Sequence, residues 1–306
     1  MSVYRGWFGT LTLAAESVDA KVIVVPEVGG RIVHYSLDDE NILWEPEGVE
    51  GKTLETGLVG LGAGGHQCDI GPEIRGIPSH PLLWGGPYQS TTTKDFTVRV
   101  TSAPDPAVGL QMSRDVILDP ETGDLGITQR MKNVSDQETA FCLWDRTLAK
   151  GGGFAFFPLN KKSRFPAKWS LRRQVDGKYV YDGKKPESPQ VKILKNVLVA
   201  RCEGPPTKIG ADSDAGWLAY VRGRLLLVKY FAYVPGGNYT DGGNSVEVYF
   251  NEKFGELEPL SPEARLKPGQ DYFFLEKWTL IKLERDVRTH EEARALVKLI
   301  PSSPNR

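Results

Sequence analysis

Apolar and polar residues alternate with a period of two along much of the chain, and the alternating runs are rich in β-branched and aromatic side chains. This pattern is typical of β-strands with one buried face. Many of the runs are bounded by Gly, Pro, Asn or Asp, which favour turns. The pattern predicts strands over residues 21–25, 96–100, 115–119, 126–131, 140–144, 216–221, 225–234, 245–250 and 271–283.

Helical signal is confined to the end of the chain. Thr289 followed by Glu292 has the spacing of a capping box, and apolar positions follow within 295–300. No helical segments of about 10 to 15 residues separate the strands, which argues against a doubly wound parallel sheet. We therefore expect an all-β fold, one large antiparallel sandwich domain over residues 1–306, with a short peripheral C-terminal helix.

The stretch 161–206 is the most polar part of the chain and is rich in Gly and Pro. It is predicted to form long surface loops and one hairpin around an Asp-Gly pair. Because functional residues collect on loops held by a rigid scaffold, these loops are candidates for the rim of a site.

Charge and composition narrow the class of partner. The 306 residues include 38 Lys and Arg against 39 Asp and Glu, for a formal net charge of −1. This balance gives no indication of a nucleic-acid groove or a polybasic membrane surface, so a small molecule is the expected partner. No apolar run is long enough to span a membrane. Three distant cysteines and an N-terminus without an apolar leader segment predict a cytoplasmic protein, unless a signal peptide has been trimmed.

Motifs for cofactor or nucleophile chemistry are not convincing. The glycine-rich stretches lack the preceding strand and following helix of a dinucleotide or phosphate site, so no cofactor is expected. No serine lies in a Gly-x-Ser-x-Gly elbow, and a hydrolase triad is not visible.

Residues 64–81, GGHQCDIGPEIRGIPSHP, concentrate the candidate chemistry. A zinc site could draw on His66, Cys68, Asp69 and His80, but their spacing matches no zinc motif and no metal is predicted. Two other interpretations stay open: a polar loop that braces its own backbone, and a wall of a ligand site.

Aromatic residues around this segment favour ligand contact. Trp44 precedes it, and Trp84 and Tyr88 follow it. Flat apolar faces beside a few polar groups suit a small ligand such as a sugar, although the same residues would also fill a core.

Three longer segments carry a resemblance to a known superfamily. VIVVPEVGGRIVHYSLDDENILWEPE (22–47), NVSDQETAFCLWDRTLAKGGGFAFFPL (133–159) and SVEVYFNEKFGELEPLSPEARLKPGQDYFFLEKWTL (245–280) together resemble galactose mutarotase-like (aldose 1-epimerase-like) proteins. The order of the motifs is most similar to an uncharacterised bacterial branch. The resemblance implies a β-supersandwich with a carbohydrate site on its concave face.

The resemblance also implies acid/base chemistry on a sugar ring. A carboxylate removes the proton of the anomeric hydroxyl while a histidine protonates the ring oxygen. Glu258 matches the position of the base, with Glu256 and Glu247 as nearby alternatives. The segment 141–148 departs from the pattern because it has no histidine. His66 or His80 could supply the proton instead.

Further residues are candidates for substrate contact. The resemblance places Arg31 near the sugar, and Arg75, Trp84, Asp145 and Arg146 are additional candidates. Asp145 and Arg146 could equally form an ion pair that fixes the strand, or Arg146 could bind a substrate carboxylate. The leading prediction is an aldose-epimerase-like enzyme. The alternatives are a non-catalytic carbohydrate-binding protein and a lyase or hydrolase acting on a glycan.

Overall fold

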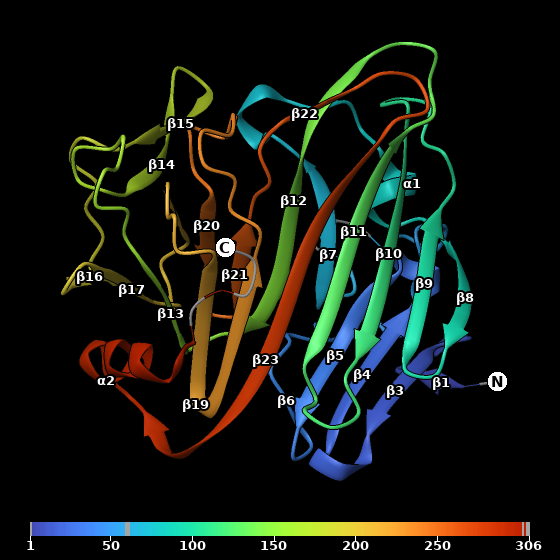
Figure 1. Cartoon of the computed structure of the whole chain (residues 1–306), viewed down its shortest axis with the longest axis horizontal. Helices are drawn as coiled ribbons and strands as arrows, with labels where there is room; N and C mark the ends of the chain where they lie inside the picture. Colours follow the sequence, from blue (N-terminus) through green and yellow to red (C-terminus); the bar gives the residue numbers. More distant parts are fainter. Residues whose placement is uncertain (1, 59–61, 302, 304–306) are drawn as a thin grey trace.

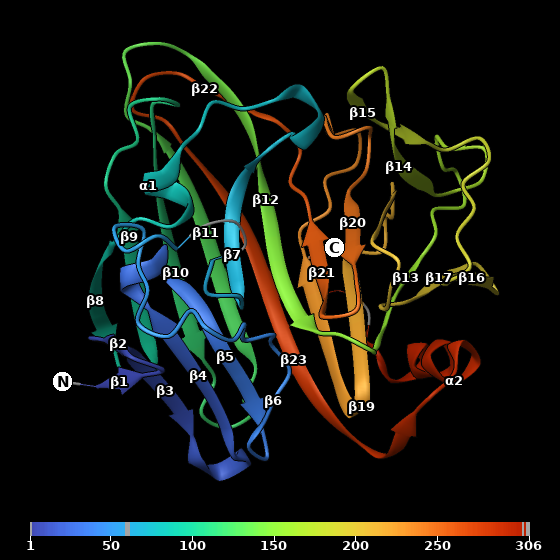
Figure 2. The same ribbon diagram turned by 180° about the vertical axis from the view of Figure 1, so that it is seen from behind.

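Two large antiparallel β-sheets face each other across the described part of the chain, residues 2–58, 62–301 and 303 of the computed structural model. Strands β23, β11 and β10 of one sheet lie in front in Figure 1. The other sheet, with β7 and β12 near its centre, is seen in Figure 2. The all-β sandwich predicted from the sequence is confirmed.

The nine-stranded sheet contains, in spatial order, β16 (Val191–Leu194), β17 (Val197–Arg201), β13 (Phe154–Pro158), β19 (Trp217–Phe231), β23 (Asp271–Val287), β11 (Leu125–Asn133), β10 (Leu110–Leu118), β9 (Thr97–Ser102) and β8 (Tyr88–Lys94). The main path of the twelve-stranded sheet is β15 (Lys178–Asp182), β14 (Ser170–Val175), β18 (Thr207–Ala211), β20 (Val246–Phe250), β21 (Phe254–Pro259), β12 (Thr139–Lys150), β7 (His66–Gly71), β5 (Arg31–Leu37), β4 (Ala20–Val25) and β3 (Leu11–Ala15). Off these paths, β22 (Ala264–Leu266) pairs with β12 and β6 (Glu40–Asn41) pairs with β5, while β1 (Val3–Tyr4) and β2 (Trp7–Phe8) form a separate pair.

The main core lies between the sheets, and the period-two pattern explains why. Burial alternates strictly along β11, and the inward residues of β12, β20 and β21 join one hydrophobic cluster with those of β10 and β23. A strand with one face on this core must direct its intervening residues outward. That second face of the twelve-stranded sheet carries the site described below.

Several observed strands lie outside the predicted ranges, and two of the differences bear on the candidate site. Residues 66–71 were expected to belong to a polar loop, but they form β7, in which every residue is buried. The two strands expected over 216–221 and 225–234 are one long strand, β19, whose register shifts between Gly223 and Leu225. The polar residues of 66–71 led to the wrong loop prediction, because a buried strand that carries polar side chains does not show a uniformly apolar pattern.

The stretch 161–206 contains the expected hairpin and one that was not expected. Strands β14 and β15 turn at Asp176 and Gly177, the Asp-Gly pair, both with positive φ. Strands β16 and β17 turn at Lys195 and Asn196, also with positive φ. This second turn lacks glycine, the usual sign of such a turn in a sequence.

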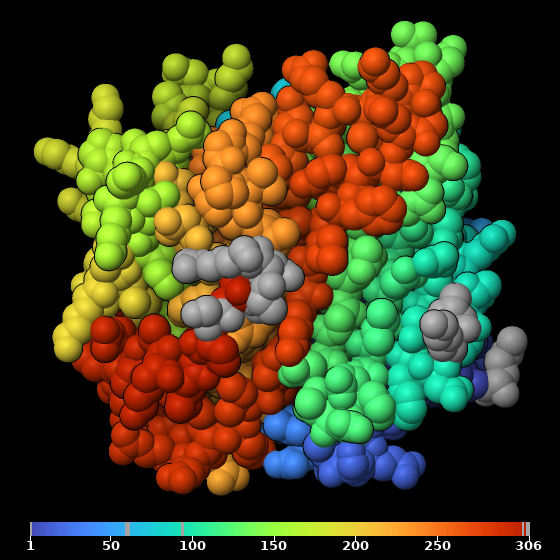
Figure 3. Space-filling view, viewed as in Figure 1, coloured from blue at the N-terminus to red at the C-terminus, as the bar shows by residue number. Residues whose placement is uncertain are grey.

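Helices are short and peripheral. They are α1 (Pro81–Trp84), α2 (His290–Ala295) and the 3-10 segments η1 (Glu16–Val18), η2 (Pro26–Val28), η3 (Glu73–Arg75) and η4 (Leu296–Leu299). The predicted capping box is present at α2: Thr289 Oγ1 accepts from the Glu292 amide, and Glu292 accepts from the Thr289 amide. In Figure 3 the C-terminal segment (red) lies beside the yellow residues of β16 and β17. Among the described helices, none combines the length and apolarity needed to cross a membrane.

Candidate functional site

Charged side chains gather on the face of the twelve-stranded sheet that points away from the core. On β21, Leu257 belongs to the core, so Glu256 and Glu258 point to the outer face. On β12, Leu143 belongs to the core and Trp144 and Arg146 point outward. We call the following residues, from six neighbouring strands, the outer-face cluster: Asp69, Trp144, Arg146, Arg172, Lys208, Glu247, Glu256 and Glu258.

One buried ammonium in this cluster holds three carboxylates. Lys208 Nζ lies 2.8 Å from Glu258 Oε2 and 3.1 Å from Glu247 Oε2. The same nitrogen lies 2.9 Å from Glu73 Oε2, at the start of η3. Trp144 Nε1 donates to Glu258 Oε2 at 2.8 Å. Both Glu247 and Glu258 have 0% exposure, so these charges interact in a medium far less polar than water.

The three carboxylates compete for one positive charge, which shifts their protonation. Burial raises the pKa of Glu258 to about 8 and that of Glu247 to about 7, although the ammonium of Lys208 opposes both shifts. Burial disfavours the charge of Lys208, but the carboxylates of Glu258, Glu247 and Glu73 raise its pKa above the ordinary value. Lys208 therefore stays charged, and near neutral pH the pair Glu247 and Glu258 retains a proton.

A second chain of ion pairs runs along the same face. His80 Nε2 lies 2.8 Å from Asp69 Oδ1, and Arg146 Nη1 lies 3.5 Å from Asp69 Oδ2. Arg146 Nε donates to Glu256 Oε1 at 2.6 Å. His80 Nδ1 also contacts the carbonyl of Pro78 at 2.7 Å, so both ring nitrogens face acceptors. Burial opposes a charge on His80, but the contact with Asp69 raises its pKa above the ordinary value and favours the protonated ring.

Aromatic rings and cations alternate across the site. The indole of Trp84 lies 4.5 Å from the guanidinium carbon of Arg31 and 4.7 Å from that of Arg146. The indole of Trp144 lies 4.5 Å from the Arg146 guanidinium carbon and 4.5 Å from Lys208 Nζ. We call this alternating stack of five side chains the cation–aromatic ladder. Cation–π contacts of this kind fix the cations without neutralising their charge.

The Gly-Gly pair before Arg31 makes the ladder sterically feasible. Gly29 and Gly30 have φ of +80° and +59°, which favour glycine. A Cβ on Gly29 would lie 2.6 Å from the carbonyl oxygen of Trp84. The absence of a side chain therefore lets α1 approach β5 closely enough for Trp84 to cover Arg31.

A pocket of about 660 Å³ opens beside the outer-face cluster. Its volume is within the range of about 300–1,000 Å³ that is usual for small-molecule sites. The pocket has an aromatic wall, where the rings of Trp44 and Phe254 lie 4.6 Å apart beside Tyr249. Its charged lining consists of Glu73, Arg146, Arg172, Lys208, Glu252, Lys253 and Glu256.

No protein-family model matches the chain, and no curated protein matches its sequence. Solved structures do match. A galactose mutarotase-like protein from Lactobacillus casei has a TM-score of 0.61 at 11% identity, covering 89% of this chain and 100% of that chain. A candidate aldose 1-epimerase from Escherichia coli has a TM-score of 0.58 at 13% identity, with coverages of 90% and 100%. The chain has the galactose mutarotase-like fold.

Two residues that were expected in the site do not lie there in this fold. His66 and Asp145 were expected to contact a ligand, but both point into the space between the sheets and have 0% exposure. His66 Nδ1 lies 3.3 Å from Asp145 Oδ2, and burial lowers the pKa of His66 well below its usual value. Successive side chains of a strand point to opposite faces of the sheet. Because Arg146 and Asp69 point to the outer face, Asp145 and Cys68 must point to the core. The proposed ion pair between Asp145 and Arg146 is therefore also wrong.

The other expected residues lie on the outer side of the sheet or at its rim. Glu258, Arg146, Trp84 and His80 belong to the outer-face cluster or contact it directly. Arg31 is almost fully buried, stacks on Trp84 and donates to the carbonyl of Gly64 at 3.1 Å. Arg75 is half-exposed and donates to Glu263 at 2.8 Å and to the carbonyl of Ala140 at 2.8 Å, a structural contact at the rim.

Sequence reasoning missed Lys208, Glu73 and Arg172 as members of the site. Glu73 pairs with both Arg172 and Lys208, which joins η3 to β14 and β18. Lys208 lies in the five-residue strand β18, which follows Pro206, contains Gly210 and is too short for a clear alternating pattern. Its full burial, the property that makes it notable, has no sign in the sequence.

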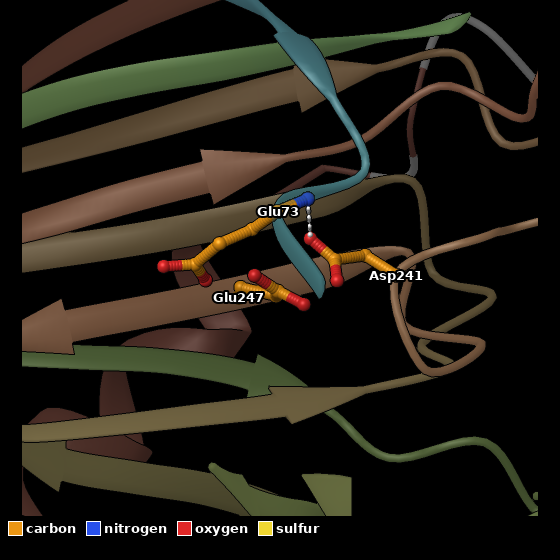
Figure 4. Close-up of side chains that lie close together, drawn as sticks. All are labelled: Glu73, Asp241 and Glu247. Atoms are coloured by element: carbon orange, nitrogen blue, oxygen red, sulfur yellow. Dashed lines mark hydrogen bonds between the residues drawn. The ribbon is translucent and has the colours of Figure 1, made fainter. Parts of the chain in front are cut away.

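A metal site in the 64–81 segment does not fit the fold. His66 and Cys68 point into the core while Asp69 and His80 lie on the outer side, so the four cannot surround one ion. A separate group is formed by Glu73, Asp241 and Glu247, whose carboxylate oxygens lie within 4.8 Å of one another (Figure 4).

Each member of that second group already has partners. Asp241 accepts from the backbone amide of Glu73 at 2.9 Å, as Figure 4 shows, and thereby caps η3. Glu247 accepts from Asn244 at 2.9 Å. The ammonium of Lys208 contacts both Glu73 and Glu247, so a cation from the protein already lies against these carboxylates. We therefore assign no metal here.

Proposed function

We propose that the protein acts on a sugar or a sugar derivative as an aldose-epimerase-like enzyme. The mutarotase-like fold suggests a sugar-related function. The aromatic wall of the pocket supports it, because the apolar face of a sugar ring packs on such rings while its hydroxyls need the polar groups opposite.

Glu258 is the proposed base, and its environment is the observation that carries the proposal. Its carboxylate is buried, its pKa is raised to about 8, and its Oε1 has no hydrogen-bond partner among the described residues. A base with a pKa near the working pH is well matched to removing the proton of an anomeric hydroxyl. As that proton moves to Glu258, an acid protonates the ring oxygen and the ring opens. Reclosure on either face of the carbonyl gives both anomers.

His80 is the proposed acid. Its pKa is raised by Asp69, which favours the protonated ring, and it lies on the same outer side of the sheet as Glu258. It connects to the pocket through Asp69 and Arg146. A ligand oxygen that displaces Asp69 from the His80 ring would receive this proton.

Sugar binding without turnover is the second candidate. Two observations favour it: Glu258 lies beneath Lys208 and Trp144 with no exposed surface, and the Nε2 proton of His80 is directed at Asp69. A glycan lyase or hydrolase is less well supported. The carboxylate nearest to Glu258 on the neighbouring strand, that of Glu247, contacts the same ammonium and does not lie across the pocket.

Polarimetry of freshly dissolved α-D-glucose and α-D-galactose tests the proposal. The wild-type protein should accelerate equilibration of at least one sugar, and Glu258→Gln should lower the rate about 10²- to 10⁴-fold. Glu291→Gln, an exposed change on α2, is the matched control and should behave as wild type. Binding of a sugar by calorimetry without any acceleration would favour the second candidate. Acceleration unchanged in Glu258→Gln would remove Glu258 from the mechanism.

A further inference from the structure

A polar network lies in the core directly behind the outer-face cluster. Its centre is Lys229 on β19 of the nine-stranded sheet, whose side chain has 0% exposure and crosses the core toward the other sheet. We call this the interior network, and its members are His66, Gln129, Asp145, Thr147, Lys229 and Glu276.

Lys229 contacts two adjacent strands of the opposite sheet. Its ammonium pairs with Asp145 Oδ1 and donates to Thr147 Oγ1 at 2.7 Å, both on β12. It also donates to the carbonyl oxygen of Leu257 on β21 at 3.4 Å. Thr147 and Leu257 are partners in the register of these two strands. The side chain therefore bridges β12 and β21 from behind.

The bridged positions alternate with the site residues. Asp145 lies between Trp144 and Arg146 in the chain, and Leu257 lies between Glu256 and Glu258. In a strand, displacement of one residue displaces its neighbours on the opposite face. The position of Lys229 thus bears on the contact between Trp144 and Glu258 and on that between Arg146 and Glu256.

His66 braces the same atoms in a defined tautomer. Arg114 Nε donates to Gln129 Oε1 at 2.9 Å, so the amide nitrogen of Gln129 faces His66 Nε2 at 3.0 Å. His66 Nε2 is therefore an acceptor, and Nδ1 carries the proton that points to Thr147 Oγ1 at 3.0 Å. Thr147 in turn donates to Asp145 Oδ1 at 2.9 Å. The neutral imidazole of His66 therefore fixes the hydroxyl of Thr147, which in turn accepts from Lys229 and donates to Asp145.

Stability alone is a weak explanation for such a network. Replacing a buried ion pair with apolar residues of similar size is often neutral or stabilising, because desolvation of the charges opposes their attraction. A buried lysine in this place is better explained by the geometry it imposes on β12 and β21.

We propose that Lys229 is a positioning residue for the outer-face cluster: by holding Asp145 and Leu257 together it sets the distance between Trp144 and Glu258, and with it the ionisation of Glu258. An effect of Lys229 on the rate of sugar turnover rests on the proposed function. The effect on Glu258 does not, because it is measurable without a ligand.

Two variants test the proposal. Lys229→Met removes the ammonium but leaves Asp145 buried without its partner, a change that alone can prevent folding. The double variant Lys229→Met, Asp145→Asn removes both charges of the Lys229–Asp145 pair and keeps the volume, while Glu276 keeps the hydrogen bond from Trp278 Nε1 at 2.9 Å. Asn133→Ala is the control: it breaks the buried hydrogen bonds of Asn133 to Gln137 and Leu266 at the end of β11, outside the interior network.

The first readout is the carboxyl carbon-13 titration of Glu258 in the ligand-free protein, assigned with Glu258→Gln. The double variant should shift this titration by about one pH unit or more, since weakening one charged hydrogen bond has effects of that size. Asn133→Ala should leave it unchanged even though it lowers the melting temperature. A folded double variant that titrates as wild type would overturn the proposal.

The second readout is sugar turnover by polarimetry with α-D-glucose and α-D-galactose. In the double variant kcat should fall about 10- to 100-fold, with a smaller change in KM, because misplacement of about 1 Å has effects of this size. If wild-type protein accelerates neither sugar, the proposed function fails, while the titration of Glu258 still decides the role of Lys229. Turnover that is lost equally in Asn133→Ala would reduce Lys229 to a purely structural residue.

Discussion

The ammonium of Lys208 and the carboxylate of Glu258 lie 2.8 Å apart, and both side chains are buried. The same ammonium contacts Glu247 and Glu73, and among the described ion pairs of these three carboxylates Glu73 alone has a second cation, Arg172, within 4.0 Å. The Lys208 site therefore holds more carboxylates than positive charges. Such an arrangement is costly unless a proton or a ligand completes it, which makes the cluster a candidate functional surface.

Stability should fall as the pH rises from about 5 to about 8. Glu247 and Glu258 have pKa values of about 7 and about 8 in the folded protein, against an ordinary 4.5, so in this window the folded state binds more protons than the unfolded state. The loss should be on the order of a few kcal/mol. Urea unfolding across this range checks it, with the double variant Glu247→Gln, Glu258→Gln as the reference. A reference slope equal to that of wild type would contradict the prediction.

Lys208→Met should lower the free energy of unfolding by about 3 to 5 kcal/mol at neutral pH, because three carboxylates lose their shared cation. The loss should shrink on acidification, when Glu247 and Glu258 take up protons. Chemical denaturation at two pH values measures both effects. Lys282→Met is the matched control: its ion pair with Glu40 is partly exposed and should contribute less than about 1 kcal/mol. Equal losses in the two variants would refute the buried network.

Asp69→Asn should lower the pKa of His80, because the carboxylate that stabilises the imidazolium is removed. The raised folded-state pKa of His80 contributes stability that is present below its unfolded pKa and is lost as the pH rises through the folded value. The variant should therefore lose stability mainly on the acidic side. Proton NMR of the histidine ring measures the titration, and His66, which burial keeps neutral, provides an internal reference. An unchanged His80 titration would contradict the assigned contact.

Trp84→Ala should cost about 1 to 4 kcal/mol, since the ring makes two cation–π contacts of about 0.5 to 2 kcal/mol each, with Arg31 and Arg146. Trp84→Phe should cost less because an aromatic face remains. Urea unfolding gives the stability change, and calorimetry with the sugar that binds wild type gives the affinity. If alanine and phenylalanine have the same effect, the ladder contributes nothing beyond packing.

Period-two patterns made the sheets predictable, and the capping box predicted α2. A residue in a recognisable motif could be located in advance: Glu258 in ELEPLSP and Arg31 in the Gly-Gly-Arg turn both lie in the mutarotase-like sandwich, beside or beneath the outer face, and their roles stay predictions. The partner of Glu258 was not predictable. Lys208 is 50 positions away in the chain, and its role depends on three-dimensional register between β18, β20 and β21.

The misplacement of His66 and Asp145 has one physical origin. Their residue types suggested ligand contact. Which face of the sheet a side chain occupies depends on whether its position in the strand is odd or even, and this can be assigned only when the strand is recognised. Residues 66–71 contain His, Gln and Asp and were not recognised as a buried strand. His66 and Asp145 can point into the core because the interior network, which includes Lys229 from the opposite sheet, supplies their polar partners. No local pattern announces such a partner.

The cation–aromatic ladder draws Arg31, Trp84, Trp144, Arg146 and Lys208 from widely separated parts of the polypeptide. Its first and last members, Arg31 and Lys208, are 177 positions apart, and Glu258 follows 50 positions after Lys208. Contacts of such long sequence separation form slowly, because the intervening loops must close first. The pocket therefore exists only when segments from distant parts of the sequence have folded together, and ligand occupancy of the pocket reports the assembled sheet and no single segment of it.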